Sequence, residues 1–370
     1  MTMKSFNMNT KNTILGLTFT ALFSGFVLVS SLLITTVSCT DVEGDGADSI
    51  WWEEVMLPDE SSYRNPVWEP DLSNPSAFRG ATQYFAFGDE KEWAPGLNYV
   101  VPVIRSSNLM TWSLSGEAFQ SGKPTWAMGP LTSVSGIFAK TLGTYYLAYT
   151  IGDEGIGIAY SKTPQGPYTD YGKIIDPAGI GMTYCRHPYF IQAGLKFYMF
   201  FENSDGIYGT EMNVIKNAPP APKGDVFKIA GTDFTGTYIF RKDAEEYYFF
   251  GTSGEGDAAG IKMAKASDIK GPYLDRDGNN ILNGFGTELV AGNAAESFIA
   301  PSHVGGIFTD YEGAEWILYQ ATDTRIPTLT TGSERHPILL SRLDLDDQGW
   351  PVTVIQAEGG WHQPKFMVSE

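Results

Sequence analysis

Residues 145–170 read YYLAYTIGDEGIGIAYSKTPQGPYTD, and residues 247–275 read YYFFGTSGEGDAAGIKMAKASDIKGPYLD. Each stretch begins with an aromatic-rich segment typical of a β-strand, and a polar turn leads to a second strand-like segment that opens on Gly-Ile. Both end on Gly-Pro-Tyr and an acid. Such similarity between distant stretches predicts a repeat architecture.

The aromatic segment recurs along the chain, with anchor residues 50 to 68 positions apart. Its copies are TQYFAFGD around Tyr84, TYYLAYT around Tyr146, KFYMFFEN around Tyr198, EYYFFGTS around Tyr248 and AEWILYQA around Trp316. That spacing suits one four-stranded antiparallel sheet per copy, and five sheets arranged radially leave only short, protected edges. We therefore expect an all-β fold, a five-bladed β-propeller. The expected blades cover about residues 65–117, 126–173, 180–230, 231–282 and 296–356.

The N-terminus has the features of a lipoprotein signal peptide, which we expect over residues 1–38. Two lysines precede an uncharged apolar run at 13–38, and Cys39 follows small residues. This pattern predicts export, cleavage before Cys39 and lipidation of its thiol. An uncleaved anchor is the alternative, because about 20 apolar residues span a bilayer. Both interpretations place the globular part outside the cytoplasm on a membrane tether, either periplasmic or at the cell surface.

Charge and cysteine content narrow the classes of partner. Residues 39–64 are expected to form an acidic tether and N-terminal segment, followed by a single propeller domain over 65–370. The net charge of −18 argues against nucleic acid as a partner. Cys185 is the only cysteine besides Cys39, so we expect no disulfide and no cysteine-based metal site. A buried structural thiol is the expected role of Cys185.

The repeat also locates a candidate site. In a propeller the innermost strand of each blade lines the central axis, and its start faces the mouth where ligands bind. Counting back from each aromatic anchor to the expected start of that strand gives five residues. These are Asn74, Ser135, His187, Thr235 and His303. If the blades are built alike, these side chains form a ring around an axial pocket.

Around these positions the chain resembles the family 43 glycoside hydrolases. The matching segments are WEPDLSNPSAFR at 68–79, GIGIAYSKTPQGPYTDYGK at 155–173, RHPYFI at 186–191, FTGTYIFRKDAEEYYFF at 234–250, APSHVGGIFTDYEGAEWILYQA at 300–321 and RLDLDDQGWPV at 342–352. The resemblance covers about residues 65–355 and implies a five-bladed propeller. It also implies hydrolysis of arabinose-, xylose- or galactose-type glycans, as in arabinanases, arabinofuranosidases and xylosidases.

The resemblance implies an inverting mechanism with three carboxylates: a general base, a residue that tunes the pKa, and a general acid. An inverting enzyme needs an acid and a base about 6.5–9.5 Å apart across the sugar ring. The matching positions here hold Asn74, His187 and Thr235. Asn cannot take a proton from water and Thr cannot deliver one at neutral pH. Other residues would have to supply the chemistry.

Three residues near these positions can exchange protons. Asp71 and Asp233 lie close in sequence to Asn74 and Thr235, and each could either reach the mouth of the pocket or cap a turn. His187 could act as general acid or base, because an imidazole titrates near neutral pH. A donor to a sugar hydroxyl or a structural histidine is its alternative role. Arg186 could bind substrate or link blades.

Two further candidates concern an ion and sugar stacking. His303 in APSHVG resembles the axial histidine of arabinanases, which implies a possible Ca²⁺ or other ion, with a water-bound histidine as the alternative. No cofactor is otherwise required. Trp126 lies in a loop near the start of a blade, where it could stack on a sugar or belong to the core.

These observations leave three hypotheses. The first is an exported, membrane-anchored hydrolase of oligosaccharides or polysaccharides with non-standard catalytic groups: Asp71 or Asp233 together with His187. The second is a catalytically inactive carbohydrate-binding propeller, in which Asn74, Trp126, Ser135, Arg186 and Thr235 contact the sugar. The third is a structural surface lipoprotein.

Overall fold

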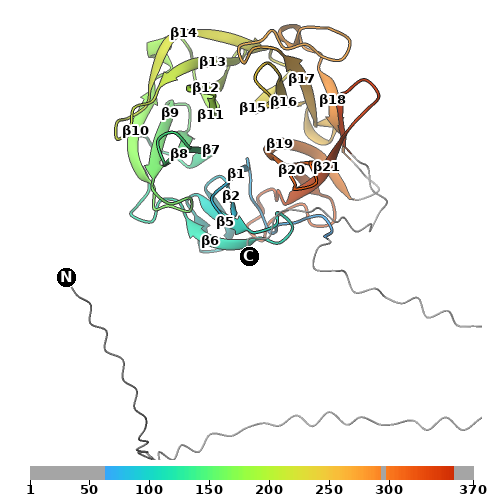
Figure 1. Cartoon of the computed structure of the whole chain (residues 1–370). Coiled ribbons are helices and arrows are strands. Elements are labelled where there is room, and N and C mark those ends of the chain that lie inside the picture. The colour runs from blue at the N-terminus through green and yellow to red at the C-terminus, as the bar shows by residue number, and fades with distance from the viewer. Residues whose placement is uncertain (1–62, 293–296, 354–370) are drawn as a thin grey trace, which may run out of the picture. The chain divides into compact units, whose positions relative to one another are not determined.

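Five four-stranded antiparallel sheets surround a common axis in the computed structural model, which describes residues 63–292 and 297–353 (Figure 1). The five-bladed propeller expected from the repeat is confirmed. Blades one and two are β1 (Ser76–Arg79), β2 (Tyr84–Phe87), β5 (Pro102–Ser106), β6 (Ser113–Glu117); and β7 (Leu131–Ala139), β8 (Thr144–Ile151), β9 (Ile156–Ser161), β10 (Thr169–Ile175).

The remaining blades have the same order from axis to rim. Blade three is β11 (Arg186–Ala193), β12 (Lys196–Asn203), β13 (Gly206–Asn213), β14 (Ala221–Ala230); blade four is β15 (Thr235–Arg241), β16 (Tyr247–Ser253), β17 (Gly260–Ala266), β18 (Thr287–Val290); blade five is β19 (Phe298–Thr309), β20 (Glu315–Asp323), β21 (Ile338–Leu345), β22 (Pro351–Thr353). A short hairpin, β3 (Lys91–Ala94) and β4 (Leu97–Tyr99), branches from blade one.

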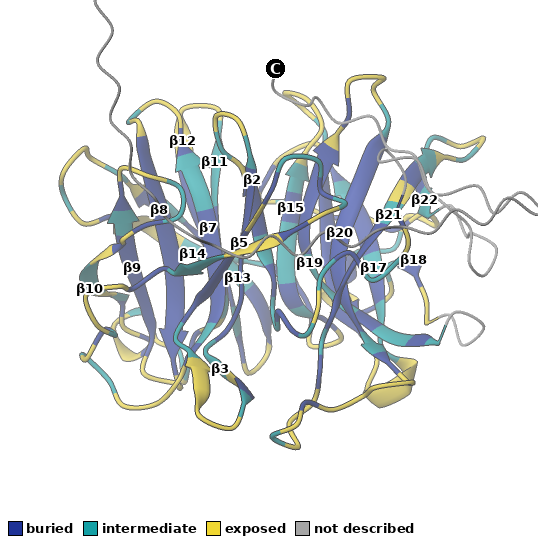
Figure 2. Cartoon of the chain, turned by 90° about the horizontal axis from the view of Figure 1, so that it is seen from below, coloured by how far each residue is buried: buried dark blue, intermediate teal, exposed yellow. Residues whose placement is uncertain are grey.

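The aromatic segments of the repeat are the second strands β2, β8, β12, β16 and β20. Nearly all their residues are buried, on both faces of each sheet. Figure 2 shows these strands in dark blue between exposed loops. Both faces are apolar because each blade packs against a neighbour on either side, so the aromatic run replaces the alternation of a half-exposed strand. Cys185 is buried among these residues, as expected, and burial raises the pKa of its thiol to about 12.

The Gly-Ile of the repeat marks the start of each third strand in blades two to four. A Cβ on Gly155 would lie 2.3 Å from the carbonyl oxygen of Ile175, and one on Gly206 would lie 2.3 Å from that of Ala230. The corresponding contact of Gly260 is 3.0 Å, to Val290. The glycine is therefore needed because the outer strand ends directly against it.

Blade four extends further than the sequence suggested. Its outer strand is β18, beyond the expected limit near residue 282. A loop with a 3₁₀ turn at Ile281–Asn283 separates β17 from β18, and the Gly-Pro-Tyr motif lies in that loop. The estimate was wrong because this loop has no counterpart of similar length in the blade two repeat.

The segment before β1 closes the ring on blade five. Val67 N–H donates to the carbonyl oxygen of Ile338 at 2.8 Å, and Ile338 N–H donates to Trp68 at 3.1 Å. The Asn65 side chain binds both backbone groups of Leu340. The chain thus supplies the edge partner for the first half of β21, and β22 covers the second half.

Two sequence-based expectations concern residues outside the described ranges. The signal peptide, Cys39 and most of the acidic tether lie before residue 63, and the C-terminal tail lies after residue 353. Among the described residues, no helix is long and apolar enough to cross a membrane.

Candidate functional site

A pocket of about 50 Å³ opens on the propeller axis at the start of the inner strands. The five residues located by counting along the repeat all line it: Asn74, Ser135, His187, Thr235 and His303. They come from five different blades, so the ring geometry expected from the repeat is present. None of the lining residues that the structure describes is Asp or Glu.

A residue with a left-handed backbone lies in each inner strand, or just before it in blade one, where the strand lines the pocket. These residues are Asn74 (φ 49°), Ser133 (φ 54°), His187 (φ 46°), Gly236 (φ 67°) and His303 (φ 47°). Counting from the aromatic anchors therefore missed the equivalent position by two residues at Ser135 and by one at Thr235. The left-handed residue turns its backbone N–H away from the strand's own ladder, which leaves that donor available to a neighbouring blade.

Four of these N–H groups donate to a polar side chain on the second strand of the preceding blade or, for Asp89, just after that strand. Asn74 donates to Gln320 at 2.6 Å, Ser133 to Asp89 at 2.6 Å, Gly236 to Glu202 at 3.4 Å, and His303 to Thr252 at 3.0 Å. We call these four acceptors, Gln320, Asp89, Glu202 and Thr252, the inter-blade belt. These hydrogen bonds fix the backbone of the pocket residues. Two belt members, Asp89 and Glu202, are carboxyl groups that contact pocket residues without lining the pocket themselves.

Glu202 connects two pocket residues. Its Oε2 lies 2.9 Å from His187 Nδ1 and accepts a hydrogen bond from Thr235 Oγ1 at 2.5 Å. Burial by itself raises the pKa of Glu202, but the hydrogen bonds from His187, Thr235 and Gly236 together lower it to about 2. An ionised carboxylate only accepts hydrogen bonds, so His187 carries a proton on Nδ1. Its other ring nitrogen, Nε2, is left as the reactive one.

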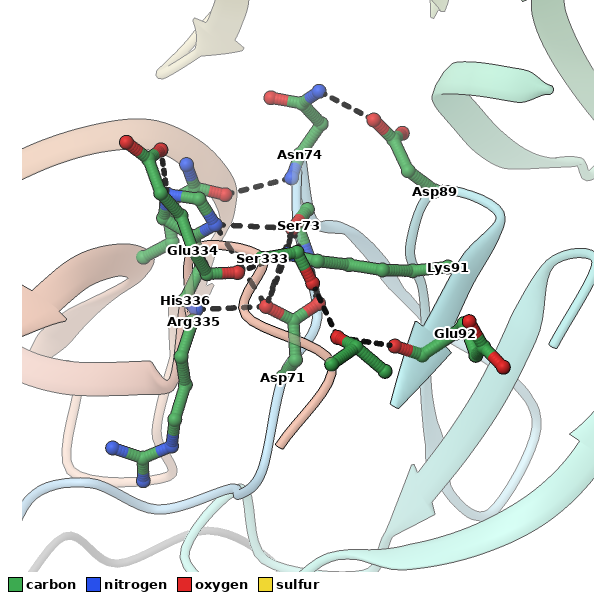
Figure 3. Close-up of polar contacts among 12 residues, drawn as sticks. Asp71, Ser73, Asn74, Asp89, Lys91, Glu92, Ser333, Glu334, Arg335 and His336 are labelled. Atoms are coloured by element: carbon green, nitrogen blue, oxygen red, sulfur yellow. Dashed lines mark hydrogen bonds and ion pairs between the residues drawn. The ribbon is translucent and has the colours of Figure 1, made fainter. Parts of the chain in front are cut away.

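Asp89 is the second carboxyl group behind the ring. Its Oδ2 accepts from the Asn74 amide at 2.6 Å, as Figure 3 shows, and its Oδ1 accepts from Ser133 N–H at 2.6 Å. Burial raises the pKa of Asp89 to about 7, against the opposing effect of these two hydrogen bonds and of His187. A carboxyl group therefore lies directly behind Asn74, in hydrogen-bond contact with its amide.

His303 is neutral in this setting. Burial lowers its pKa to about 3, and the neighbouring charges of His187 and His336 add to the shift. The Gln320 amide nitrogen lies 3.4 Å from His303 Nδ1, which makes Nδ1 the acceptor and puts the proton on Nε2. Nε2 is buried and has no hydrogen-bond partner among the described residues. It is available to donate to a ligand.

These donors do not fit the axial ion expected near His303. Ca²⁺ takes about six to eight oxygen ligands, and a protonated imidazole nitrogen cannot bind a cation. The described part of the chain holds no group of three or more His, Cys, Asp or Glu that could hold a metal ion. The ion stays a prediction that these residues do not support.

Asp71 lies outside the pocket, in a buried polar cluster with Ser73, Lys91 and His336 (Figure 3). Its carboxylate is 1% exposed and receives hydrogen bonds from Lys91 Nζ at 2.8 Å and from His336 N–H at 2.7 Å. Ser73 N–H donates to the other oxygen at 3.1 Å. With these donors in place, Asp71 fastens the entry of blade one to blade five.

The other predicted site residues also lie away from the lining. Asp233 is exposed beside Gly284, where an added Cβ would lie 2.8 Å from its Oδ2. Arg186 forms a bidentate ion pair with Asp153 at 2.5 and 2.9 Å, which joins blades two and three. Trp126 donates to the Tyr149 hydroxyl at 2.9 Å and packs in the blade two core. The contacts of Arg186 and Trp126 match their structural alternatives.

Sequence reasoning missed Asp89 and Glu202, although both stand inside the quoted aromatic segments. They occupy the equivalent place near the end of TQYFAFGD and KFYMFFEN, as Thr252 and Gln320 do in their own segments. Aligning these segments shows a polar residue after a buried aromatic run in every copy. That signal was present, but it was attributed to the turn.

The fold and site together define a five-bladed propeller with a polar axial pocket, and this architecture does not by itself determine an activity. The model of glycosyl hydrolases family 43 matches residues 63–351, and the chain belongs to this family. It is 22% identical to extracellular endo-α-(1→5)-L-arabinanase 2 of Bacillus subtilis, over 80% of this chain and 73% of that protein. It is 23% identical to the extracellular exo-α-(1→5)-L-arabinofuranosidase ArbA of Cellvibrio japonicus, over 76% and 86% of the two chains.

Solved structures show the same fold. The α-L-arabinanase of Cellvibrio cellulosa, determined in complex with arabinohexaose, superposes with a TM-score of 0.64 at 20% identity, covering 78% of this chain and 96% of that one. The endo-arabinanase of Bacillus licheniformis gives a TM-score of 0.61 at 23% identity, covering 76% and 97%.

Proposed function

We propose that this protein binds the end of an arabinan-type oligosaccharide in the axial pocket and hydrolyses its glycosidic bond with a displaced set of proton-transfer groups. The observation that carries the proposal is the His187–Glu202 contact at the pocket wall. The arabinan preference is inferred from the activities that the relatives' names state. The chain shares its fold with an arabinanase of known structure.

His187 is the general acid in this proposal. Among the pocket residues contributed by blades one, three and four, Asn74 and Thr235 cannot exchange protons at neutral pH, whereas an imidazole can. Glu202 acts as a positioning residue, because its hydrogen bond fixes the imidazole ring and directs Nε2 to the pocket. A carboxylate behind a histidine stabilises the charged imidazolium in the same way in other hydrolases.

Asp89 is the second carboxyl group that the mechanism requires. It contacts the pocket residue Asn74, which neither Asp71 nor Asp233 does among the hydrogen bonds of the described residues. With its pKa raised to about 7, Asp89 becomes a base at neutral to alkaline pH. We therefore take Asp89, which is 8% exposed, rather than the two aspartates chosen from the sequence, as the proposed base for a water molecule beside Asn74.

The test is turnover of linear α-1,5-arabino-oligosaccharides by wild type, His187→Ala and Glu202→Gln. We expect His187→Ala to lower kcat at least 100-fold. In Glu202→Gln the glutamine amide can donate to His187 Nδ1, whereas in the wild type the carboxylate accepts from it. We expect this variant to lower kcat about 10-fold and to shift the pH profile of kcat. Arg186→Gln, which removes the ion pair with Asp153 and the contact with the Tyr184 ring, is the control and should keep kcat within about threefold. Equal kcat for wild type and His187→Ala would contradict the proposal.

A second candidate function is carbohydrate binding without cleavage. The observation that favours it is the absence of any carboxylate among the pocket-lining residues. It predicts that arabino-oligosaccharides raise the melting temperature of the wild type, while no new reducing ends form. Release of reducing ends that His187→Ala abolishes would exclude it.

Export and lipid anchoring form the cellular part of the proposal. They rest on the apolar segment before Cys39 and on relatives whose names describe extracellular enzymes. The test is metabolic labelling with a radioactive fatty acid followed by membrane fractionation. Label on the wild type and none on Cys39→Ser supports the anchor, and an unlabelled wild type overturns it.

A further inference from the structure

A second, larger cavity lies at the other end of the inner strands. Its volume is about 690 Å³, and its wall includes Arg79 at the end of β1 and Lys140 just after β7. The axial pocket, in contrast, is lined by the starts of these strands. Ser76, Tyr189 and Tyr238 line both spaces, so they form the partition between them. The two tyrosine rings lie 5.1 Å apart, centroid to centroid.

The wall of this cavity combines aromatic rings with positive charge. Phe78, Phe138 and Phe308 provide flat apolar surface together with the two partition tyrosines. Among the described lining residues, Arg79 and Lys140 are the only charged ones, and none is Asp or Glu. Cavities that bind organic ligands have this composition, with apolar walls and a few polar groups that fix orientation.

The two cations are available to a ligand. Both side chains are exposed, and neither forms a salt bridge with any other described residue. The Arg79 guanidinium lies 5.9 Å from the centre of the Tyr84 ring, and this cation–π contact helps to orient the arginine side chain.

This arrangement differs from that at the axial mouth. There Lys91 is paired with Asp71 at 2.8 Å, and Arg186 is paired with Asp153. The whole chain carries a net charge of −18. Two cations without a salt bridge to a described residue, beside aromatic walls, suit an anion that also has apolar surface.

We propose that the opposite cavity is a binding site for an acidic saccharide, whose carboxylate pairs with Arg79 and Lys140 while its ring packs on the phenylalanine walls. Arginine suits this role because its planar group can bind a carboxylate in bidentate fashion. The volume exceeds that of a small inorganic anion, so the site accommodates a sugar ring. The inference does not depend on the chemistry of the axial pocket.

The experiment is calorimetric titration of the mature protein with trigalacturonate, with neutral galactotriose as the uncharged counterpart. We expect trigalacturonate to bind at least tenfold more tightly than galactotriose and to lose affinity as NaCl is raised. The double variant Arg79→Gln/Lys140→Gln should bind trigalacturonate at least tenfold more weakly. Lys216→Gln, which removes an exposed cation elsewhere, is the matched control and should bind like wild type.

Three results would overturn the proposal: no trigalacturonate binding by a wild type that melts cooperatively, equal affinity in wild type and double variant, or competition by inorganic phosphate at equal affinity. The last result would identify a simple anion site. Arabino-oligosaccharide binding is measured on the same samples. That binding reports on the axial pocket. If neither the wild type nor any variant binds arabino-oligosaccharide, the result counts against the proposed function and does not affect the acidic site.

Discussion

Asp89 is a carboxyl group with little access to water, and its protonation links the pocket to stability. Because its pKa is raised from 3.8 to about 7 by burial, the folded protein binds this proton more tightly than the unfolded chain does. Its contribution to stability is therefore full at low pH and is lost as the pH rises from about 4 through 7. Above that range the buried charge costs free energy.

We expect Asp89→Asn to remove this dependence. At pH 8 the variant should be more stable than the wild type by about 1–3 kcal/mol, and at pH 4 the difference should vanish. Denaturant unfolding of both proteins from pH 4 to 8 measures the difference directly. Asp225→Asn, at an exposed carboxylate, should show no such trend. A variant less stable than wild type at pH 8 would mean that the hydrogen bonds of Asp89 outweigh its desolvation.

The site residues show how far sequence reasoning reached at this scale. Counting along the repeat placed Asn74, His187 and His303 on the axis, because the strand starts are set by the same left-handed turn. It did not find Asp89 or Glu202. Asp89 and Glu202 matter because residues of the next blade donate hydrogen bonds to them. The sequence of one repeat does not show which groups of the next blade will be close enough to do so.

The order and burial of the strands could be predicted from the repeat because every blade packs between two neighbouring blades in the same way. The aromatic second strand and the glycine before the third strand are both local requirements, so they recur wherever a blade occurs. The length of the blade four loop could not be predicted in this way. The loop contributes its own buried residues, Tyr273 and Ile281, and no feature of the repeat sets its length.

The glycine at the start of the third strand gives a prediction for one element. Gly206→Ala should destabilise the propeller by about 2–3 kcal/mol, since φ is 136° there and the new Cβ would lie 2.3 Å from the Ala230 carbonyl oxygen. Denaturant unfolding measures the loss. Gly224→Ala is the control: its φ is 88° but nothing lies within 4 Å of its Cβ position, so it should cost about 1 kcal/mol. Equal losses of stability in Gly206→Ala and Gly224→Ala would show that backbone strain, and not the close contact with Ala230, determines the cost.

At the scale of the whole molecule, the propeller depends on one closing contact. Neighbouring inner strands contact one another around the ring, and β1 contacts β19 where the first and last blades meet. Outside that contact, residues 63–72 join the edge of β21 by backbone and side-chain hydrogen bonds. Blades two to four are each built from one continuous stretch, so none of them needs such a segment. The repeat alone therefore could not predict the closure.

Asn65 tests whether this closure controls global stability. Its amide donates to the Leu340 carbonyl at 3.0 Å, and its carbonyl oxygen accepts from Leu340 N–H at 2.9 Å, so Asn65→Ala leaves the buried N–H without that partner. We expect a loss of about 1–3 kcal/mol in a single cooperative transition, because an open ring exposes blades one and five together. Asn98→Ala, at an exposed position of the β3–β4 hairpin, should change stability by less than about 0.5 kcal/mol. A two-step melt of Asn65→Ala would instead show that the blades unfold independently, and that the propeller is held blade by blade rather than by its closing contact.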